Sequence, residues 1–369
     1  MLGCAALVFP HATRHVTAGE SRGAGIDRPM VITMNKDATP DQVRAVADRV
    51  RELGYVPHEM PGAQRTAICI TGNKGPVDPS LFTRFEGVAD AVAISQPYKL
   101  VSRELKPDAT VVEVRGVKIG GGPFCVMAGP CSVESREQVL ATAAHVRKHG
   151  AHVLRGGAFK PRTSPYDFQG LKEEGLRILA EAREVTNMPV ITEVKDAETL
   201  PMVAEYADVL QIGARNMQNF SLLERIGELG KPVMLKRGLS STVKEWLMAA
   251  EYIVSRGNRN VILCERGIRT FETMTRNTLD LGILPLLRSI THLPIIVDPS
   301  HGTGVAKAVA PLARAAAATG VDGIMVEVHP DPTKALSDGL QALTFSMFEE
   351  MMHDVTRIVE VMGQKIAAH

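Results

Sequence analysis

The sequence has 369 residues and a formal net charge of +1; 45% of its residues are hydrophobic and 22% are charged. This composition is that of an ordinary globular protein with two or three domains. The near-zero charge argues against general binding to nucleic acid or to an anionic membrane. No apolar run approaches the roughly 18 residues that a membrane span needs. Five cysteines, an odd number, give no disulfide framework. We therefore expect a cytoplasmic protein with no nucleic-acid or membrane partner.

Residues 1–29 differ in character from the rest of the chain. Leu2 to Phe9 is apolar, but it lacks a basic segment in front and a clean small-residue cleavage site, which argues against a secretory signal. The Gly, Arg, His and Ser mixture that follows is typical of unstructured chain. We expect a disordered tail over 1–29, with Met30 beginning the folded protein.

Residues 30–95 alternate between short apolar runs and helix signals. Thr39 and Pro40 mark the start of a helix over 41–53, because Thr is a good N-cap and Pro fits the first helical position. The pattern predicts strands over 30–34, 55–59, 66–71 and 88–94 and helices over 41–53 and 79–84. This β-α-β-β-α-β order predicts a small ferredoxin-like α+β domain. Because no residue in it has catalytic spacing, we expect a binding or dimerisation module, with a purely structural appendage as the alternative.

A connector over 96–123 follows. Two short apolar runs, 110–114 and 117–119, flank Arg115-Gly116 and predict a hairpin, which we expect to cover the floor of the next domain.

From Phe124 to the end, strand and helix patterns alternate eight times. The strand runs are short and almost continuously apolar, as buried parallel strands are. We predict strands over 124–128, 151–155, 189–193, 208–212, 232–236, 260–265, 294–298 and 323–328, and helices over 135–149, 171–186, 198–205, 219–229, 241–256, 275–288, 304–319 and 336–363. Eight such units predict a (β/α)8 TIM barrel over 124–369. A doubly wound open sheet is the alternative, but no Gly-x-Gly-x-x-Gly motif follows any of these strands.

Chemically active residues gather at the predicted carboxyl ends of these strands, where TIM barrels place their active sites. A thiol, an imidazole and two carboxylates could form a cage for one divalent metal of the Mn, Fe, Co or Zn class: Cys131, His301, Glu327 and Asp338. Cations also converge there, which indicates polyanionic ligands such as phosphates and carboxylates: Arg155, Lys160, Arg162, Arg215, Lys236, Arg237 and Arg266.

Each of these residues also has a simpler interpretation. Any single arginine could be the partner of a nearby carboxylate, and His301 could be a buried structural histidine. Lys236, at a strand end, could instead form a Schiff base, as lysines do in some barrel aldolases.

Seven segments closely resemble the type I 3-deoxy-D-arabino-heptulosonate 7-phosphate (DAHP) synthases, in the branch shared with 3-deoxy-manno-octulosonate 8-phosphate synthases. They are 128–134, 154–170, 211–216, 235–238, 262–267, 297–301 and 326–330. The resemblance covers residues 30–366. It implies condensation of phosphoenolpyruvate with D-erythrose 4-phosphate and water, the first step of the shikimate pathway to the aromatic amino acids.

The resemblance also implies roles for individual residues. The metal ligands would be Cys131, His301, Glu327 and Asp338. Phosphoenolpyruvate would contact Arg155, Lys160, Gly213, Ala214, Arg215, Lys236, Arg266 and His301. The sugar phosphate would contact Lys160, Pro161, Arg162, Thr163, Ser164 and Asp298. Lys160, His301 and Asp298 would be catalytic, with Lys160 between the two substrates as the general acid.

The same resemblance implies a homotetramer whose N-terminal domain binds an aromatic amino acid as a feedback inhibitor. The connector would hold this domain near the barrel mouth, at the carboxyl ends of the strands. His58 stands where an effector contact is expected, whereas Met60 brings no hydroxyl to recognise tyrosine. Three alternatives stay open: a sister enzyme that uses arabinose 5-phosphate, a Schiff-base aldolase, and a non-catalytic amino-acid sensor.

Overall fold

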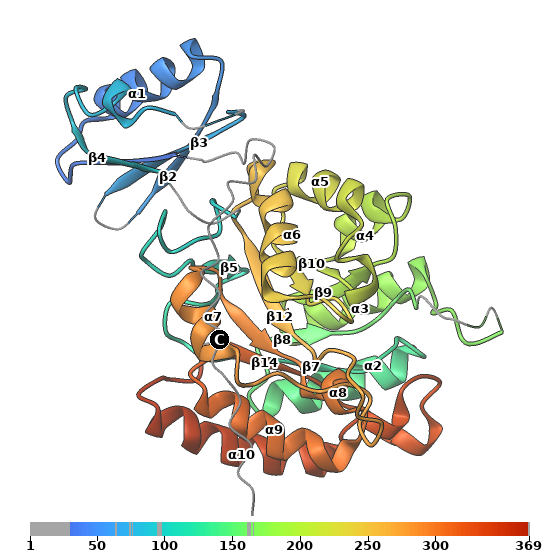
Figure 1. Cartoon of the computed structure of the whole chain (residues 1–369). Coiled ribbons are helices and arrows are strands. Elements are labelled where there is room, and N and C mark those ends of the chain that lie inside the picture. Colours follow the sequence, from blue (N-terminus) through green and yellow to red (C-terminus); the bar gives the residue numbers. More distant parts are fainter. Residues whose placement is uncertain are drawn as a thin grey trace, which may run out of the picture.

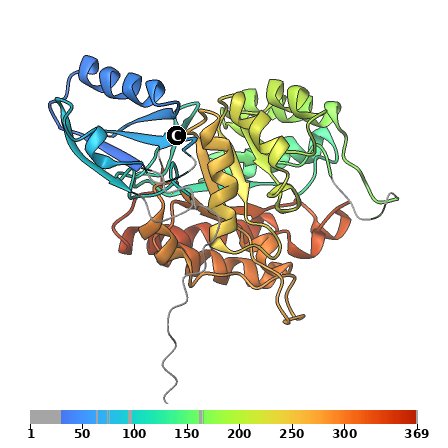
Figure 2. The ribbon, with the colours of Figure 1, turned by 45° about the horizontal axis from the view of Figure 1, so that its top comes forward.

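The computed structural model describes residues 30–367 except for 63–64, 74, 76, 94–97, 161–163 and 165 (Figure 1). The predicted tail over 1–29 lies outside the described residues, and so do Pro161, Arg162 and Thr163 of the predicted sugar-phosphate site. The structure has a small N-terminal domain and a larger barrel (Figures 1 and 2).

The N-terminal domain is an antiparallel sheet with one long helix against it. Its elements are β1 (Met30–Met34), α1 (Pro40–Glu52), β2 (Val56–Pro61), β3 (Thr66–Thr71), the 3-10 turn η1 (Pro79–Leu81) and β4 (Val88–Ala93). The strand order β2-β3-β1-β4 confirms the ferredoxin-like domain. The helix predicted over 79–84 is only a single 3-10 turn.

The two faces of this sheet are both covered, because side chains alternate along each strand. Ile32 and Ile68 point to one face and pack against Val46 and Val50 of α1. Val31 and Cys69 point to the other face and join the core that continues into the barrel.

The barrel is a closed ring of eight parallel strands, which confirms the predicted architecture. The strands are β7 (Cys125–Gly129), β8 (Val153–Arg155), β9 (Val190–Val194), β10 (Val209–Ile212), β11 (Val233–Lys236), β12 (Val261–Glu265), β13 (Ile295–Val297) and β14 (Gly323–Glu327). Each strand pairs with its neighbours in sequence, and β14 pairs with β7 to close the ring.

Helices surround the ring: α2 (Arg136–Lys148), α3 (Glu173–Thr186), α4 (Leu200–Tyr206), α5 (Phe220–Glu228), α6 (Val243–Ser255), α7 (Leu284–Ile290), α8 (Pro299–Thr303), α9 (Ala306–Ala318) and α10 (Phe345–Val361). Two predicted helices are too long. The helix predicted over 275–288 begins only at Leu284, and the one predicted over 336–363 begins at Phe345. None of the helices in the described residues is both long and apolar enough to cross a membrane.

The predicted hairpin is present as β5 (Val112–Val114) and β6 (Val117–Ile119). Arg115 and Gly116 both have positive φ, as a two-residue turn of type I′ requires. The hairpin's valines pack with the apolar side chains that fill the barrel interior, including Met127 and Met325. The hairpin therefore closes the barrel floor, at the amino ends of the strands.

The connector lies at the floor as well. Thr110 Oγ1 lies 2.8 Å from His292 Nδ1, and His292 Nε2 lies 2.8 Å from the carbonyl oxygen of Leu100. His292 precedes β13, so these bonds fasten the connector to the amino ends of the strands. Arg259, just before β12, also contacts the carbonyl oxygen of Glu59 in the N-terminal domain. The expectation that the connector tethers this domain near the barrel mouth is therefore wrong for this structure.

Candidate active site

A polar pocket of about 230 Å³ opens at the carboxyl ends of the barrel strands. Among the described residues, its lining includes six cations: Lys160, Arg215, Lys236, Arg266, Arg269 and Arg276. The carboxylates in this described lining are Glu193 and Asp338. An excess of positive charge in a concave site favours ligands that carry several negative charges.

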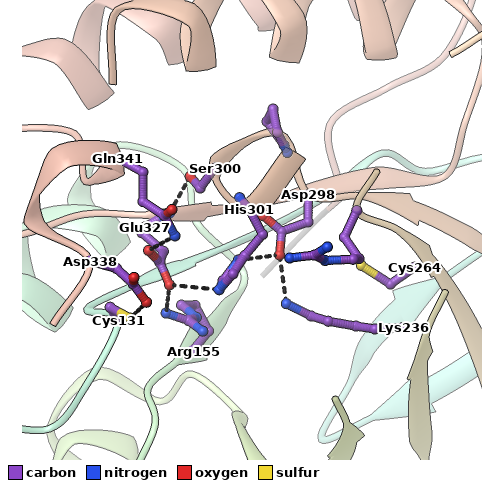
Figure 3. Close-up of polar contacts among 12 residues, drawn as sticks. Cys131, Arg155, Lys236, Cys264, Asp298, Ser300, His301, Glu327, Asp338 and Gln341 are labelled. Carbon is purple, nitrogen blue, oxygen red and sulfur yellow. Dashed lines mark hydrogen bonds and ion pairs between the residues drawn. The ribbon is translucent and has the colours of Figure 1, made fainter. Parts of the chain in front are cut away.

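A thiol and two carboxylates meet at one side of this pocket (Figure 3). Cys131 follows β7, and Glu327 ends the neighbouring strand β14, so the pairing of these two strands brings the residues together. Asp338 comes from the loop after β14. One ligand atom of each residue lies within 4.8 Å of the other two, and Cys131 Sγ donates to Asp338 Oδ2 at 3.2 Å.

His301 lies next to this group but not within it. It is held by α8, where Asp298 caps the helix by accepting the His301 backbone N–H at 3.0 Å. The ring bridges two carboxylates, since Nδ1 is 2.7 Å from Asp298 Oδ2 and Nε2 is 3.4 Å from Glu327 Oε1. His301, the fourth predicted ligand, therefore contacts this group at Glu327.

The buried charges of this site set one another's ionisation. Burial alone would raise the pKa of Glu327, but His301, Arg155 and Lys160 lower it to about 2. In the same way, His301 and Lys236 hold the pKa of Asp298 well below its usual range against the effect of burial. Burial, and then the charge of Glu327, raise the pKa of the Cys131 thiol to about 12. Without a bound cation, the thiol is protonated at neutral pH.

Lys160 stands between the thiol and the pocket. Its Nζ donates to Cys131 Sγ at 2.9 Å and to the Cys131 carbonyl oxygen at 3.2 Å, and the side chain lines the pocket. Gly157 permits this approach, because a Cβ at that position would lie 2.8 Å from the Cys131 carbonyl oxygen and 2.9 Å from Lys160 Cδ.

Arg155 and Gln341 hold the two oxygens of Glu327. Arg155 Nη1 donates to Oε1 at 2.7 Å and to the Pro130 carbonyl oxygen at 2.9 Å, and Gln341 Nε2 donates to Oε2 at 2.7 Å. Arg155 is 4% exposed, and its Nε has no hydrogen-bond partner among the described residues. In this structure it supports Glu327 from behind and does not line the pocket.

The predicted site residues therefore divide into groups. Those on the pocket wall are Lys160, Gly213, Ala214, Arg215, Lys236, Arg266, His301 and Asp338. Cys131, Asp298 and Glu327 do not line the pocket but contact residues of its wall, and Arg155 contacts Glu327. Ser164 is described but does not line the pocket. Arg237, one of the cations expected at the mouth, is instead buried and paired with Glu265 at 2.8 Å and Asp280 at 3.1 Å.

Sequence reasoning missed three residues: Arg269, Arg276 and Gln341. Both arginines lie in the loop between β12 and α7, part of which was predicted as helix. Arg276 Nη1 lies 3.0 Å from Gln341 Oε1 and 3.4 Å from Asp338 Oδ1. The sequence does show arginines at 266, 269 and 276. They could be assigned to the pocket only with the knowledge that their loop folds back over the barrel mouth.

The chain matches known proteins over nearly all of its described length. Residues 102–361 match the model of the DAHP synthetase I family, and residues 30–96 match that of the DAHP synthase ferredoxin-like domain. A phospho-2-dehydro-3-deoxyheptonate aldolase of Thermotoga maritima is 49% identical over 337 residues, covering 91% of this chain and 100% of that protein. A 2-dehydro-3-deoxyphosphooctonate aldolase of Bradyrhizobium diazoefficiens is 36% identical over 267 residues, covering 66% and 93%.

Two solved structures are also similar. The crystal structure of a Thermotoga maritima phospho-2-dehydro-3-deoxyheptonate aldolase (DAHP synthase) has a TM-score of 0.74 at 48% identity, covering 92% of this chain and 99% of that one. A truncated form of 3-deoxy-D-arabino-heptulosonate 7-phosphate synthase from the same organism has a TM-score of 0.69 at 51% identity, covering 73% and 99%.

Proposed function

The chain belongs to the DAHP synthetase I family, and on that premise we propose that it condenses phosphoenolpyruvate with D-erythrose 4-phosphate and water. The products are 3-deoxy-D-arabino-heptulosonate 7-phosphate and phosphate, in the first step of the shikimate pathway. The observation that best supports this reaction is the pocket, whose described lining includes six cations and which lies beside the group of one thiol and two carboxylates. Such a pocket suits two phosphate-bearing substrates and one cation.

The donor set fits one divalent transition metal. Cys131, Glu327 and Asp338 present a sulfur and two carboxylates within 4.8 Å of one another, with His301 beside Glu327. A sulfur ligand favours metals of the Mn, Fe, Co or Zn class over Mg or Ca. When bound, the metal would supply Lewis-acid polarisation of the aldehyde oxygen.

Phosphoenolpyruvate would occupy the wall formed by Gly213, Ala214, Arg215, Lys236 and Arg266. Its carboxylate and phosphate call for several cationic donors, and arginine can bind either group through two parallel hydrogen bonds. His301 and Lys160 border the same wall. Arg155 does not line the pocket, but its Nε has no hydrogen-bond partner among the described residues and would be the donor with which it joins this set.

The sugar phosphate would lie on the loop after β8, where Lys160, Pro161, Arg162, Thr163 and Ser164 stand in sequence. Asp298 would complete this subsite. Lys160 begins this run of residues and lines the pocket, so it can contact both substrates.

In the proposed reaction the protein itself takes part in few chemical steps. The methylene carbon of phosphoenolpyruvate attacks the aldehyde carbon, and Lys160 gives a proton to the aldehyde oxygen as it becomes a hydroxyl. Burial opposes the charged form of Lys160, but Cys131, in its thiolate form, and Glu327 raise its pKa, so it is an ammonium that can act as an acid. Water adds to the former enol carbon, and cleavage of the carbon–oxygen bond releases phosphate. The remaining site residues position the two substrates and stabilise the charge that develops during the reaction.

Phosphate release tests this proposal directly. The protein should release phosphate from phosphoenolpyruvate with erythrose 4-phosphate and Mn(II), and EDTA should abolish the activity. A preference for arabinose 5-phosphate would contradict the substrate and indicate the sister reaction. Activity that survives rigorous metal removal would contradict the metal role, and no release with either sugar would favour the non-catalytic sensor.

We further propose that the protein is a homotetramer and that the N-terminal domain binds an aromatic amino acid. The match to the DAHP synthase ferredoxin-like domain supports the regulatory role. His58, whose Nε2 lies 2.8 Å from Thr71 Oγ1, is the proposed polar contact, whereas Met60 is buried. Activity assays with phenylalanine, tyrosine and tryptophan, together with analytical ultracentrifugation, test both statements; no effect of any of the three, or a smaller assembly, would contradict them.

A further inference from the structure

A second group of metal-ligating side chains lies between α2 and α10, away from the pocket. His145 and His149 stand on α2, and Glu349 stands on α10. One ligand atom of each lies within 4.8 Å of the other two, and His149 Nε2 is 3.9 Å from Glu349 Oε2. None of the three lines the pocket at the barrel mouth.

The spacing of the two histidines suits a shared ligand. Residues four apart lie on the same face of a helix, and here the two rings stack with centroids 4.5 Å apart. Two imidazoles and a carboxylate form a nitrogen and oxygen donor set that binds zinc-class metals. No thiol is involved, which distinguishes this group from the one around Cys131.

The surroundings of His145 resemble those of a metal ligand. Its Nε2 lies 3.1 Å from the carbonyl oxygen of Phe345, and the Phe345 ring stacks on it with centroids 4.1 Å apart. Ligating histidines almost always donate their other ring N–H to a carbonyl or carboxylate, which fixes the tautomer and the ring orientation. With the proton on Nε2, the lone pair needed by a metal is on Nδ1.

The group is open to solvent and lies where carboxylates outnumber cations. The side chains of His149 and Glu349 are 19% and 59% exposed, so an ion can reach them. His149, Glu349 and Glu360 line a surface hollow together with Arg357, and Glu349 and Glu350 line a second one with Asp354. These carboxylates attract a divalent cation to the face on which the histidines lie.

We propose that His145, His149 and Glu349 bind a zinc-class divalent metal and that this metal fastens α2 to α10. These helices follow β7 and β14, the first and last strands of the barrel, which pair with each other to close the ring. The bound metal would therefore stabilise the part of the barrel where its first and last strands, β7 and β14, pair. This proposal goes beyond the proposed function and does not depend on it.

Zinc binding to the metal-stripped protein tests the site. Equilibrium dialysis against Zn(II) should give two equivalents per chain for the wild type. The Cys131→Ser variant, in which the pocket group has lost its sulfur, should retain one equivalent, and His149→Ala introduced into it should leave none. Retention of that equivalent in the double variant, with circular dichroism showing a folded protein, would overturn the proposal.

A matched pair of neighbours separates coordination from general negative charge. In the Cys131→Ser background, Glu349→Gln should weaken Zn(II) binding at least tenfold, whereas Glu350→Gln should leave it unchanged. Zn(II) should also raise the unfolding temperature of Cys131→Ser but not that of Cys131→Ser/Glu349→Gln. Equal effects of the two glutamines, or no thermal difference, would overturn the proposal. A failure of the pocket site alone would appear differently, as unchanged zinc content in Cys131→Ser.

Discussion

Lys236 and His301 contact the same oxygen atom, Oδ2 of Asp298, at 2.6 Å from Nζ and 2.7 Å from Nδ1 (Figure 3). The carboxylate is fully buried, so it depends on these two partners for its charge to be tolerated. The Nζ atom of Lys236 donates to this oxygen and is held in the ion pair, so it is not free to attack a carbonyl carbon. The arrangement therefore argues against the Schiff-base interpretation of Lys236, and borohydride with erythrose 4-phosphate, which carries the aldehyde, should trap no adduct at this lysine.

Replacing Asp298 should damage both stability and catalysis. Asp298→Asn leaves the Lys236 charge buried without its partner, which costs about 3–5 kcal/mol in comparable buried pairs. It also removes the anion that orients the His301 ring, so turnover should fall by about 10–100-fold. Urea unfolding and steady-state kinetics measure the two effects. Asp331→Asn, in an exposed turn, is the control that should change neither; an active, fully stable Asp298→Asn protein would contradict the assignment.

Cys131→Ser should lower metal content and activity together. Serine keeps the size of the side chain but loses the soft sulfur donor that favours transition metals. Metal analysis after dialysis into Mn(II) or Zn(II) measures the loss. Cys264→Ala, which changes a buried free cysteine of β12, should retain its metal. Unchanged metal content in Cys131→Ser, after allowing for the proposed site at His149, would refute the pocket ligand set.

Lys160→Ala should lower kcat by about 10²–10⁴ while changing KM much less, because the lost proton transfer acts in the transition state. Lys195→Ala, in which an exposed lysine of the loop after β9 is removed, should behave as the wild type. A variant that loses affinity for both substrates but turns over normally at saturation would show that Lys160 only holds charge.

Arg276 should set the affinity of the metal without being a ligand. It lies within hydrogen-bond distance of Gln341, which holds Glu327, and 3.4 Å from Asp338. Loss of such supporting groups weakens metal binding by about 10–100-fold. Arg276→Ala should therefore raise the metal dissociation constant. Arg269→Ala removes another cation of the same pocket and should raise KM for a substrate instead; the same effect on metal affinity from both variants would contradict this division of roles.

The connector should loosen in acid because of His292. This imidazole is 3% exposed, and burial lowers its pKa to about 4, with Lys106 and Arg103 adding to the effect. In the unfolded chain the value is near 6.5. Between these two values, only the unfolded chain takes up the proton. The contribution of His292 to stability is therefore complete above pH 6.5 and falls by about 3 kcal/mol as the pH decreases to 4.

Unfolding in urea at pH 7 and pH 4.5, followed by the fluorescence of the single tryptophan, Trp246, measures this dependence. The comparison that isolates His292 is with His292→Gln, which cannot be protonated in this range. The free energy of unfolding of the variant should change less between the two pH values than that of the wild type. Equal changes in the two proteins would show that other groups carry the acid sensitivity.

Local sequence patterns predicted most of the fold. The apolar runs at Val261 and Ile295 and the turn at Arg115-Gly116 encode their own strands and hairpin, because burial and positive φ are local requirements. The loop over 266–283 was partly misread because its shape depends on distant partners. The backbone N–H of Arg276 bonds to Thr303 and that of Asn277 to Gly302, in α8. No local pattern specifies those bonds.

The site shows the same division. Cys131, Glu327 and Lys236 could be placed because each stands at or just past a strand end, where any parallel barrel gathers side chains. Arg155 was also at a strand end, but its direction toward Glu327 follows from the closure of the ring, which places β8 and β14 on the two sides of β7. The position of the connector depends on His292, which is 182 residues from Thr110, and nothing near either residue indicates that contact.

That separation has a consequence for how the protein is made. The hairpin and connector leave the ribosome early, but the residues that cover them, such as His292, leave it much later. Until then the valines of the hairpin stay exposed, and a nascent chain with uncovered apolar surface is prone to association. Closing so long a loop is also slow. The floor of the barrel is thus assembled from segments that are synthesised far apart in time, and the apolar side chains of the hairpin stay partly uncovered until translation has passed β13.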